Sequence, residues 1–114
     1  FSTDNLVGVF AANQDAVNGV ISATNDGTDL DKANGKYKDI FVVGFDSGTS
    51  QRQAVTNGQF LGSVTQDPYQ MGYQAVTLAV KAANGEAVED VDTGSKWYNA
   101  ENIDSEEISV LLYD

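Results

Sequence analysis

The chain has no cysteine and no histidine, and only six of its 114 residues are basic. The first two absences exclude disulfides, thiolate nucleophiles, Cys/His zinc sites and a Ser-His-Asp triad within this chain. Seventeen acidic residues bring the net charge to −11. Because this charge repels phosphate backbones and anionic membranes, we expect no nucleic-acid partner. No apolar run approaches the length of a membrane span.

What is present is the composition of a small folded domain, with 41% hydrophobic residues. A chain of this length buries roughly two-thirds of its unfolded surface, which is enough for one core. The first five residues have the character of a helix end and a turn that lead directly into an apolar strand. We therefore expect this chain to be a fragment of a longer protein.

Three apolar runs organise the chain, and each ends on a polar residue. The central run, residues 40–45, is rich in β-branched and aromatic side chains and stops at Asp46. This pattern predicts a strand buried on both faces of a parallel sheet. Residues 6–12 and 60–65 are similar apolar runs, and they are followed by the polar residues Asn13 and Gln66.

Helical spacing follows each of these runs. Apolar residues recur at helical intervals over 16–24, and residues 49–57 form a second helix with a capping box of Ser50 and Gln53. The third helix, 68–83, begins with the N-cap Asp67 and a proline at its first position. This alternation predicts an α/β fold with a Rossmann-like parallel sheet and flanking helices. Further short strands are expected at 87–91 and 96–98, and a short helix or extended tail after residue 105.

The polar strand ends suggest a ligand site. Ligands of open α/β sheets bind at the carboxyl edge, where Asn13, Asp46 and Gln66 are expected to meet. One carboxylate and two amides match the donors and acceptors of vicinal sugar hydroxyls, and Phe45 could present its ring to the C–H side of a sugar. The alternative is that these residues only cap helices or finish strands, and Gln66 leans towards that alternative because it adjoins the cap at Asp67.

Other chemistries find little support. Asp29, Asp31, Asn34 and Gly35 lie in a polar segment, but they lack the spacing of a calcium loop, and a solvated loop is the simpler interpretation. Asp15 could pair with Asp46 as two catalytic carboxylates, yet it is more simply an acidic residue in the first turn of a helix. No Gly-rich phosphate fingerprint follows any strand. We expect no catalytic residue, no metal, no cofactor and no enzymatic activity.

Several stretches resemble the sugar-binding proteins of bacterial ABC importers, of the ribose- and galactose-binding type with two lobes. They are Val-Phe-Ala-Ala-Asn-Gln-Asp at 9–15, Val-Val-Gly-Phe-Asp at 42–46 and Ala-Val-Thr-Asn-Gly at 54–58. The most specific is Gly-Ser-Val-Thr-Gln-Asp-Pro-Tyr-Gln-Met-Gly at 62–72, and residues 91–94 and 102–104 resemble the closing segment of the family. At position 14 the family more often has an acidic residue.

The resemblance implies that Asn13, Asp46 and Gln66 contact a monosaccharide and that Phe45 forms a wall of the site. It implies a solute-binding component that delivers sugar to an ABC permease, located outside the cytoplasm in the periplasm or as a surface lipoprotein. By analogy, residues 1–66 belong to the C-terminal lobe, 67–95 form the hinge and a segment that crosses to a missing N-terminal lobe, and 96–114 return as a closing tail. An apolar stripe on the third helix would then lack its partner and the sheet edges would be open, so we expect either self-association or a chain trimmed from the longer protein.

Two other classes remain. The effector-binding core of a repressor of the lactose-repressor family shares this fold, but such repressors tend to have a proline-led Leu-Thr-Thr-Val at the third strand, where this chain has residues 62–68. A sugar-processing or nucleotide-binding Rossmann enzyme is more remote. The sequence upstream of Phe1 would discriminate between the importer protein and the repressor. A turnover assay would test for the enzyme.

Overall fold

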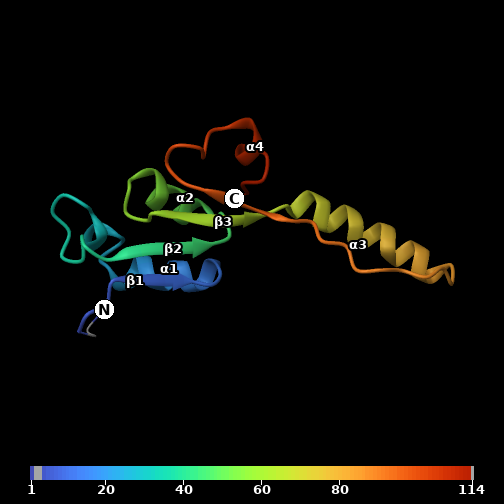
Figure 1. Cartoon of the computed structure of the whole chain (residues 1–114), viewed down its shortest axis with the longest axis horizontal. Coiled ribbons are helices and arrows are strands. Elements are labelled where there is room, and N and C mark those ends of the chain that lie inside the picture. Colours follow the sequence, from blue (N-terminus) through green and yellow to red (C-terminus); the bar gives the residue numbers. More distant parts are fainter. Residues whose placement is uncertain (2–3, 114) are drawn as a thin grey trace.

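The computed structural model describes residue 1 and residues 4–113. Along the chain these form β1 (Gly8–Ala11), α1 (Gln14–Ala23), the 3-10 helix η1 (Thr28–Leu30), β2 (Phe41–Phe45), α2 (Thr49–Thr56), β3 (Gly62–Gln66), α3 (Pro68–Ala83), β4 (Ser95–Tyr98) and α4 (Glu106–Ser109) (Figure 1). The four strands form one sheet in the order β1-β2-β3-β4. The first three are parallel and β4 is antiparallel to β3. The predicted α/β fold is confirmed, with one antiparallel strand added at the edge.

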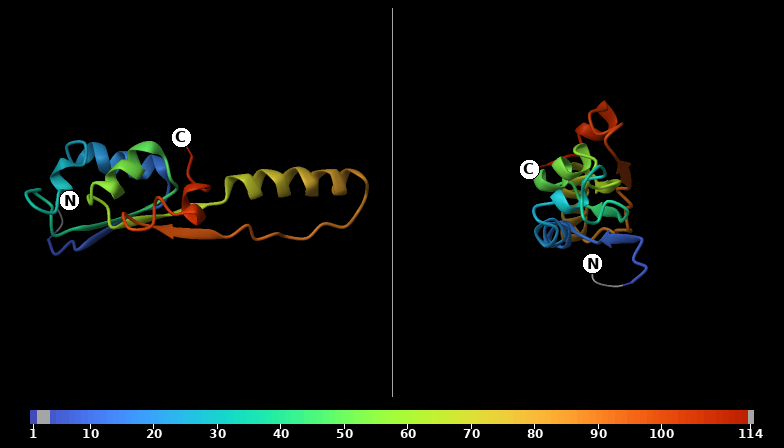
Figure 2. Two further views of the ribbon diagram at one scale, coloured as in Figure 1. Left: turned by 90° about the horizontal axis from the view of Figure 1, so that it is seen from above. Right: turned by 90° about the vertical axis from the view of Figure 1, so that its left-hand side faces the viewer.

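Helices α1 and α2 lie on the same face of the sheet, as seen from above in Figure 2. Strand alternation and register point Val42, Gly44, Ser63, Thr65 and Tyr98 towards this face, and all five are buried. The hydrophobic core forms between this face and the helices. Its members are Ala11, Val17, Leu30, Ile40, Val42, Ala54, Val55, Phe60, Tyr98, Ile103 and Ile108.

The opposite face of the sheet, which we term the open face, has no covering helix among the described residues (Figure 2). Its side chains include Phe10, Phe41 and Trp97, which are 61%, 56% and 40% exposed. The prediction that the central strand is buried on both faces is therefore wrong. The apolar composition of β2 is explained on one side by the core and on the other by an unpartnered surface.

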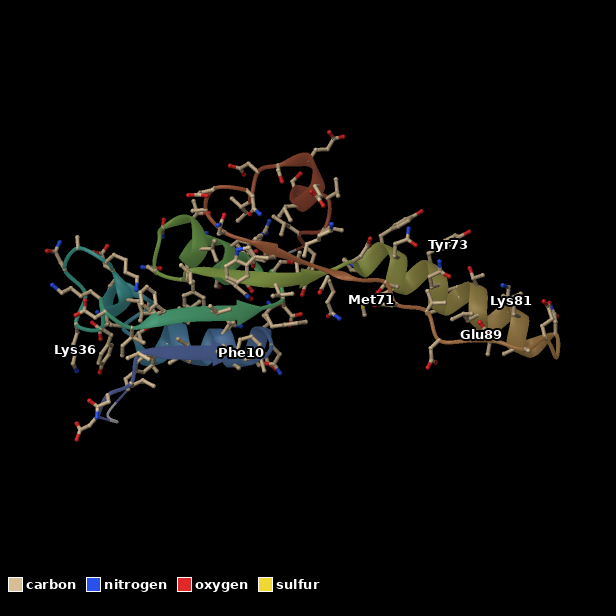
Figure 3. The ribbon with its side chains drawn as sticks, viewed as in Figure 1. Phe10, Lys36, Met71, Tyr73, Lys81 and Glu89 are labelled. Atoms are coloured by element: carbon tan, nitrogen blue, oxygen red, sulfur yellow. The ribbon has the colours of Figure 1, made fainter. Side chains whose placement is uncertain are left out.

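Helix α3 and the returning segment 84–94 project from the sheet as an arm (Figures 1 and 3), giving the molecule extents of 59 × 31 × 19 Å. The helix bounds match the prediction, and the Asp67 carboxylate caps it by accepting from the Gln70 N–H at 2.8 Å. No residue of α3 is buried, and Met71 is 42% exposed. The strand expected at 87–91 is wrong, since this segment lies against helix α3 and no strand among the described residues pairs with it.

The arm leaves and rejoins the sheet at neighbouring positions. Gln66, the last residue of β3, pairs directly with Ser95, the first residue of β4. Strands β3 and β4 are therefore the two halves of an antiparallel hairpin whose connection is the whole of residues 67–94. None of the helices in the described part of the chain has both the length and the apolar character needed to cross a bilayer.

Helix α2 begins at the predicted residue, Thr49, but its cap differs from the prediction. Its N-cap is Gly48, and no side chain caps it, so the capping box of Ser50 and Gln53 is wrong. A Cβ at Gly48 would collide with the side-chain amide of Gln14, which lies against it. The side chain of Gln14 at the start of α1 thus lies directly against the turn after β2.

Candidate functional site

The carboxyl ends of β1, β2 and β3 lie at one edge of the sheet because these strands are parallel and adjacent. Asn13 lies two residues after Ala11, Asp46 directly follows Phe45, and Gln66 is the last residue of β3. Gln66 was expected just after its strand and instead belongs to it. Each predicted polar residue is therefore delivered to the same edge by a different strand.

Asn13 is the N-cap of α1. Its backbone is extended, and its Oδ1 accepts a hydrogen bond from the Ala16 N–H at 2.8 Å. Capping of this kind satisfies a backbone donor that the helix itself leaves without a partner. The capping role weighed in the sequence is thus present in the structure. The same side chain also carries an amide NH₂, which can donate to a ligand because the residue is exposed.

Asp46 lies next to the start of the same helix. Its Oδ2 accepts from the Gln14 N–H at 2.9 Å, so Asn13 and Asp46 both bind backbone donors of the first turn of α1. A carboxylate at a helix N-terminus is stabilised by the helix dipole, and it can accept further hydrogen bonds because it has about four acceptor positions. The structure therefore brings Asn13 and Asp46 together around one helix end.

Phe45 and Gln66 lie on the open face. Phe45 pairs with Val64 across β2 and β3, and alternation points Phe45, Val64 and Gln66 to the same side of the sheet. Both Phe45 and Gln66 are half-buried. Phe45 and Gln66 thus extend the open face towards the candidate site, whereas Asn13 and Asp46 adjoin α1.

A buried polar cluster behind Asp46 was not predicted. The Asp46 carbonyl accepts from Ser63 Oγ at 3.1 Å and from Tyr98 Oη at 2.9 Å. Gln51 Nε2 donates to the Phe45 carbonyl at 3.1 Å and to Ser63 Oγ. Burial raises the pKa of the Tyr98 phenol to about 12, so its hydroxyl stays protonated and able to donate at neutral pH.

Only part of this cluster could have been predicted from the sequence. Ser63 and Thr65 interrupt the third apolar run at alternate positions, which places two hydroxyls on one face of a strand. Gln51 stands in a polar helix and could not be distinguished from a solvent-facing residue. Tyr113, near the end of the chain, was also missed: burial first, and then the Asp46 carboxylate, raise the pKa of its phenol.

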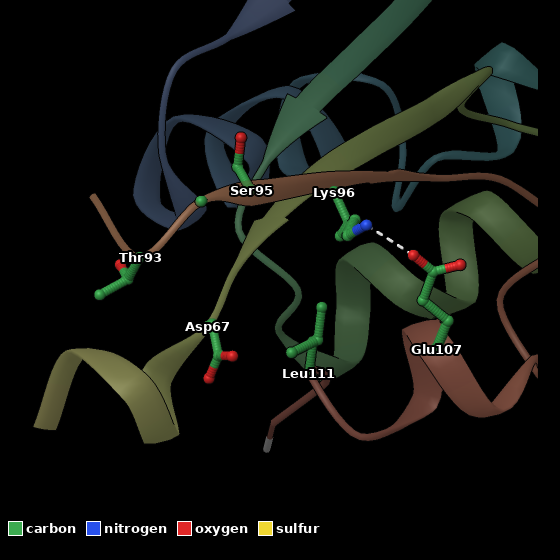
Figure 4. A pocket seen from close by; sticks show the side chains of 7 residues that line it. Asp67, Thr93, Ser95, Lys96, Glu107 and Leu111 are labelled. Carbon is green, nitrogen blue, oxygen red and sulfur yellow. Dashed lines mark hydrogen bonds and ion pairs between the residues drawn. The ribbon is translucent and has the colours of Figure 1, made fainter. Parts of the chain in front are cut away.

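A pocket of about 380 Å³ lies beside the predicted site, where the arm joins the sheet (Figure 4). Its lining combines Asp67, Ser95, Lys96, Glu107 and Leu111 with two residues of the returning segment. Lys96 and Glu107 form an ion pair of 2.5 Å across it, and both side chains are more than half exposed. None of the four predicted site residues lines this pocket.

In the described part of the chain, no group of three or more acidic residues could hold a metal ion. In the polar segment that was compared with a calcium loop, Asp31 Oδ1 accepts from the N–H groups of Ala33 and Asn34, at 2.9 and 3.0 Å. That carboxylate oxygen therefore organises a local turn.

An open α/β sheet with polar side chains at its carboxyl edge is the arrangement of a small-molecule binding domain. The model of the periplasmic binding protein domain matches residues 1–87. The chain therefore belongs to the periplasmic binding protein family. No curated protein matches the chain.

Solved structures support this assignment. A protein from Brachyspira murdochii described as an ABC transporter and LacI family transcriptional regulator is 42% identical, with a TM-score of 0.82 over 95% of this chain and 35% of its own. A carbohydrate transporter solute-binding protein from Agrobacterium radiobacter, in complex with D-arabinose, is 33% identical, with a TM-score of 0.78 over 94% of this chain and 34% of its own. An ABC transporter solute-binding protein from Agrobacterium vitis with bound D-fucose is 27% identical, with a TM-score of 0.71 over 93% and 34%. This chain spans about a third of the length of each.

Proposed function

We propose that this chain supplies one side of the sugar site of a solute-binding protein that serves an ABC importer. In this site Asn13, Asp46 and Gln66 hydrogen-bond the hydroxyls of a monosaccharide, and Phe45 packs against its ring. The observation that carries the proposal is the placement of Asp46 at the carboxyl end of a central parallel strand, beside Asn13 at the start of α1. The similarity to solute-binding proteins that hold D-arabinose and D-fucose gives the ligand class.

The proposed parent protein has two lobes that close over the sugar and deliver it to a permease. Residues 1–66 and 96–114 belong to one lobe, and residues 67–95 form the hinge and a segment that enters the other. Two observations support this division: no residue of α3 is buried within this chain, and the similar structures are about three times as long. The crossing helix would bury its apolar stripe, which includes Met71 and Leu78, in the second lobe.

We assign binding and not catalysis to this site, because the proposed ligand contacts are hydrogen bonds and ring packing, and the family is of the solute-binding type. The proposal includes no metal and no cofactor. It places the protein outside the cytoplasm, in the periplasm or as a lipoprotein at the cell surface, because a solute-binding protein must meet its sugar before the permease does.

A second candidate is the effector-binding core of a transcriptional repressor, since the description of the Brachyspira murdochii protein also names the LacI family. We favour the importer over the repressor because residues 62–68, in and directly after the third strand, differ from the repressor pattern. The sequence upstream of Phe1 in the complete protein distinguishes the two candidates. A secretion or lipoprotein signal supports the importer, and a helix-turn-helix supports the repressor.

The decisive experiment is a thermal-shift screen of the complete two-lobe protein against a panel of monosaccharides. We expect one sugar to stabilise it, by about 2.7 kcal/mol when present at a hundred times its dissociation constant. Asp46→Ala should abolish this stabilisation. The matched control is Asp39→Ala, which removes an exposed carboxylate two residues before β2, beyond the opposite end of that strand. Equal sugar binding by Asp46→Ala and the unchanged protein would refute the site.

The isolated chain should bind sugar weakly. Three polar contacts of about 0.5–3 kcal/mol each, reduced by the cost of association, correspond to millimolar affinity or weaker. Titration calorimetry of the 114-residue chain with the sugar found in the screen measures this directly. Micromolar binding would contradict the requirement for a second lobe.

We also propose that the isolated chain self-associates through its open face, where Phe10, Phe41 and Trp97 are exposed. Sedimentation velocity over a concentration series should show a dimer or larger species that Phe41→Lys weakens. Ser22→Lys makes the same charge change on an exposed position of α1 and should leave the association unchanged. A monomer at every concentration would rule this out.

A further inference from the structure

The backbone of Asp46 adopts an unusual conformation. Its φ angle is 81°, in the left-handed region that residues with a Cβ rarely enter. Such a conformation costs about 1–3 kcal/mol and persists only when surrounding contacts determine it. The position of the Asp46 carboxylate therefore depends on the groups that hold its main chain.

Both backbone polar groups of Asp46 are held from neighbouring strands. Its N–H donates to the Val64 carbonyl at 2.7 Å. Its carbonyl accepts from Ser63 Oγ on β3 and from Tyr98 Oη on β4, at 3.1 and 2.9 Å. The carbonyl oxygen has two lone pairs, so these two hydroxyls satisfy it completely.

Tyr98 is the more distant of the two donors in sequence. Its side chain is completely buried, and it belongs to the core. A buried phenol without a partner would be costly, and the Asp46 carbonyl is the acceptor that the structure gives it. The phenol of Tyr98 and the conformation of Asp46 therefore stabilise each other.

We propose that Tyr98 is a positioning residue for the ligand site: its hydroxyl, together with that of Ser63, fixes the left-handed backbone of Asp46 and thereby the direction of the Asp46 carboxylate. Tyr98 itself does not touch the ligand. The structural part of this inference concerns the contact between Asp46 and Gln14 and is independent of the ligand. The part that concerns affinity rests on the sugar-binding function proposed above.

The structural part is tested by amide hydrogen exchange in the 114-residue chain, followed by NMR. The probe is the Gln14 N–H, whose acceptor is Asp46 Oδ2. Tyr98→Phe should lower protection at Gln14 by about fivefold, the effect of losing one hydrogen bond of ordinary strength. Protection in β1 and in the interior of α1 should be retained. Tyr37→Phe, which removes a phenol hydroxyl from a half-buried tyrosine outside the cluster, should change nothing at Gln14.

Ser63→Ala is the second variant, and it keeps the test informative if Tyr98→Phe does not fold. It removes the other donor to the Asp46 carbonyl and should lower the protection of the Gln14 N–H in the same selective way. Unchanged protection at Gln14 in either folded variant, or a loss spread evenly over the chain, would overturn the positioning role.

The affinity part uses the complete two-lobe protein and the sugar identified in the screen. Tyr98→Phe should weaken the dissociation constant about fivefold, whereas Asp46→Ala should abolish binding. Val55→Ala is the stability control: it lowers the melting temperature through the core, away from Asp46, and should leave the dissociation constant unchanged.

The outcomes separate the two claims. Retained affinity in Asp46→Ala refutes the proposed sugar site and leaves the exchange result at Gln14 standing. Loss of binding in Asp46→Ala with unchanged affinity in Tyr98→Phe overturns the positioning role and leaves the sugar site standing.

Discussion

The face of the sheet beneath α1 and α2 buries Val42, Ser63 and Tyr98 completely, whereas the open face leaves Phe10 and Phe41 more than half exposed. The covered face thus holds hydroxyl groups, and the open face holds large aromatic rings. Burial in this chain is decided by which helices lie over a strand and not by the hydrophobicity of each residue. The hydroxyls are tolerated inside because each has a hydrogen-bond partner.

The largest expected effect comes from a comparison of a buried and an exposed phenylalanine. Phe60 is 2% exposed and Phe41 is 56% exposed. Phe60→Ala should lower the free energy of unfolding by about 3–5 kcal/mol because it leaves a cavity in the core. Phe41→Ala should change it by less than about 1 kcal/mol. Urea denaturation at a concentration where the chain is monomeric measures both, and similar losses there would show that Phe41 is covered within the single chain.

Two glycines make a second comparison. An alanine Cβ at Gly44, on the covered face, would be 3.0 Å from Val17 and from the Ser63 hydroxyl, and closer still to Gln51 Nε2. Gly44→Ala should therefore cost about 1–3 kcal/mol by overpacking. At Gly8, on the open face, the Cβ would meet only the Phe41 carbonyl at 3.4 Å. We expect Gly8→Ala to be neutral or slightly stabilising in the same assay.

A third comparison exchanges hydroxyl and methyl groups at neighbouring positions of β3. Thr65 Oγ1 bonds to Ser47 Oγ at 3.1 Å on the covered face, whereas Val64 points to the open face. Thr65→Val should cost about 1 kcal/mol because the buried Ser47 hydroxyl loses this partner. Val64→Thr should fall within about 0.5 kcal/mol of the unchanged chain. Thermal unfolding followed by circular dichroism distinguishes the two, and the reverse order would contradict the assignment of faces.

The smallest effect is expected at the solvent-exposed ion pair of Lys96 and Glu107. The hydrogen bond and the charge of Lys96 hold the pKa of the Glu107 carboxyl below its ordinary value of 4.5. A lowered folded-state pKa gives a contribution that is present above pH 4.5 and is lost as the pH falls through the folded-state value. The urea midpoints of the unchanged chain and Glu107→Gln should therefore differ slightly at pH 7 and coincide at pH 2. A difference that persists at pH 2 would show that the effect of the substitution is not electrostatic.

Strand and helix order could be predicted from the sequence because the apolar runs and the helix signals alternate without ambiguity. Asp67 and Pro68 even gave the first residue of α3 correctly. The open face could not be predicted, because an apolar strand has the same composition whether its second face is covered by a helix or left bare. The strand expected at 87–91 failed for a related reason: pairing requires a neighbouring strand, which local sequence does not reveal.

The positions of the candidate site residues at the sheet edge could be predicted from the sequence, but the contacts that hold them could not. Asn13, Asp46 and Gln66 are visible as polar ends of apolar runs. The left-handed backbone of Asp46 and its contact with Tyr98, a residue far along the chain, arise only from the fold. Local pattern cannot report a hydrogen bond between residues separated by 52 positions.

The pairing of Gln66 with Ser95 has a consequence for how this chain folds. Since these residues are opposite one another, a two-residue turn could join them in place of the arm. Shortening the connection from residues 67–94 to such a turn would remove about 2 kcal/mol of loop-closure entropy. The arm is therefore an insertion between the two strands of an otherwise ordinary hairpin. A chain without the arm would be the smallest unit in which to study how Tyr98 reaches the Asp46 carbonyl during folding.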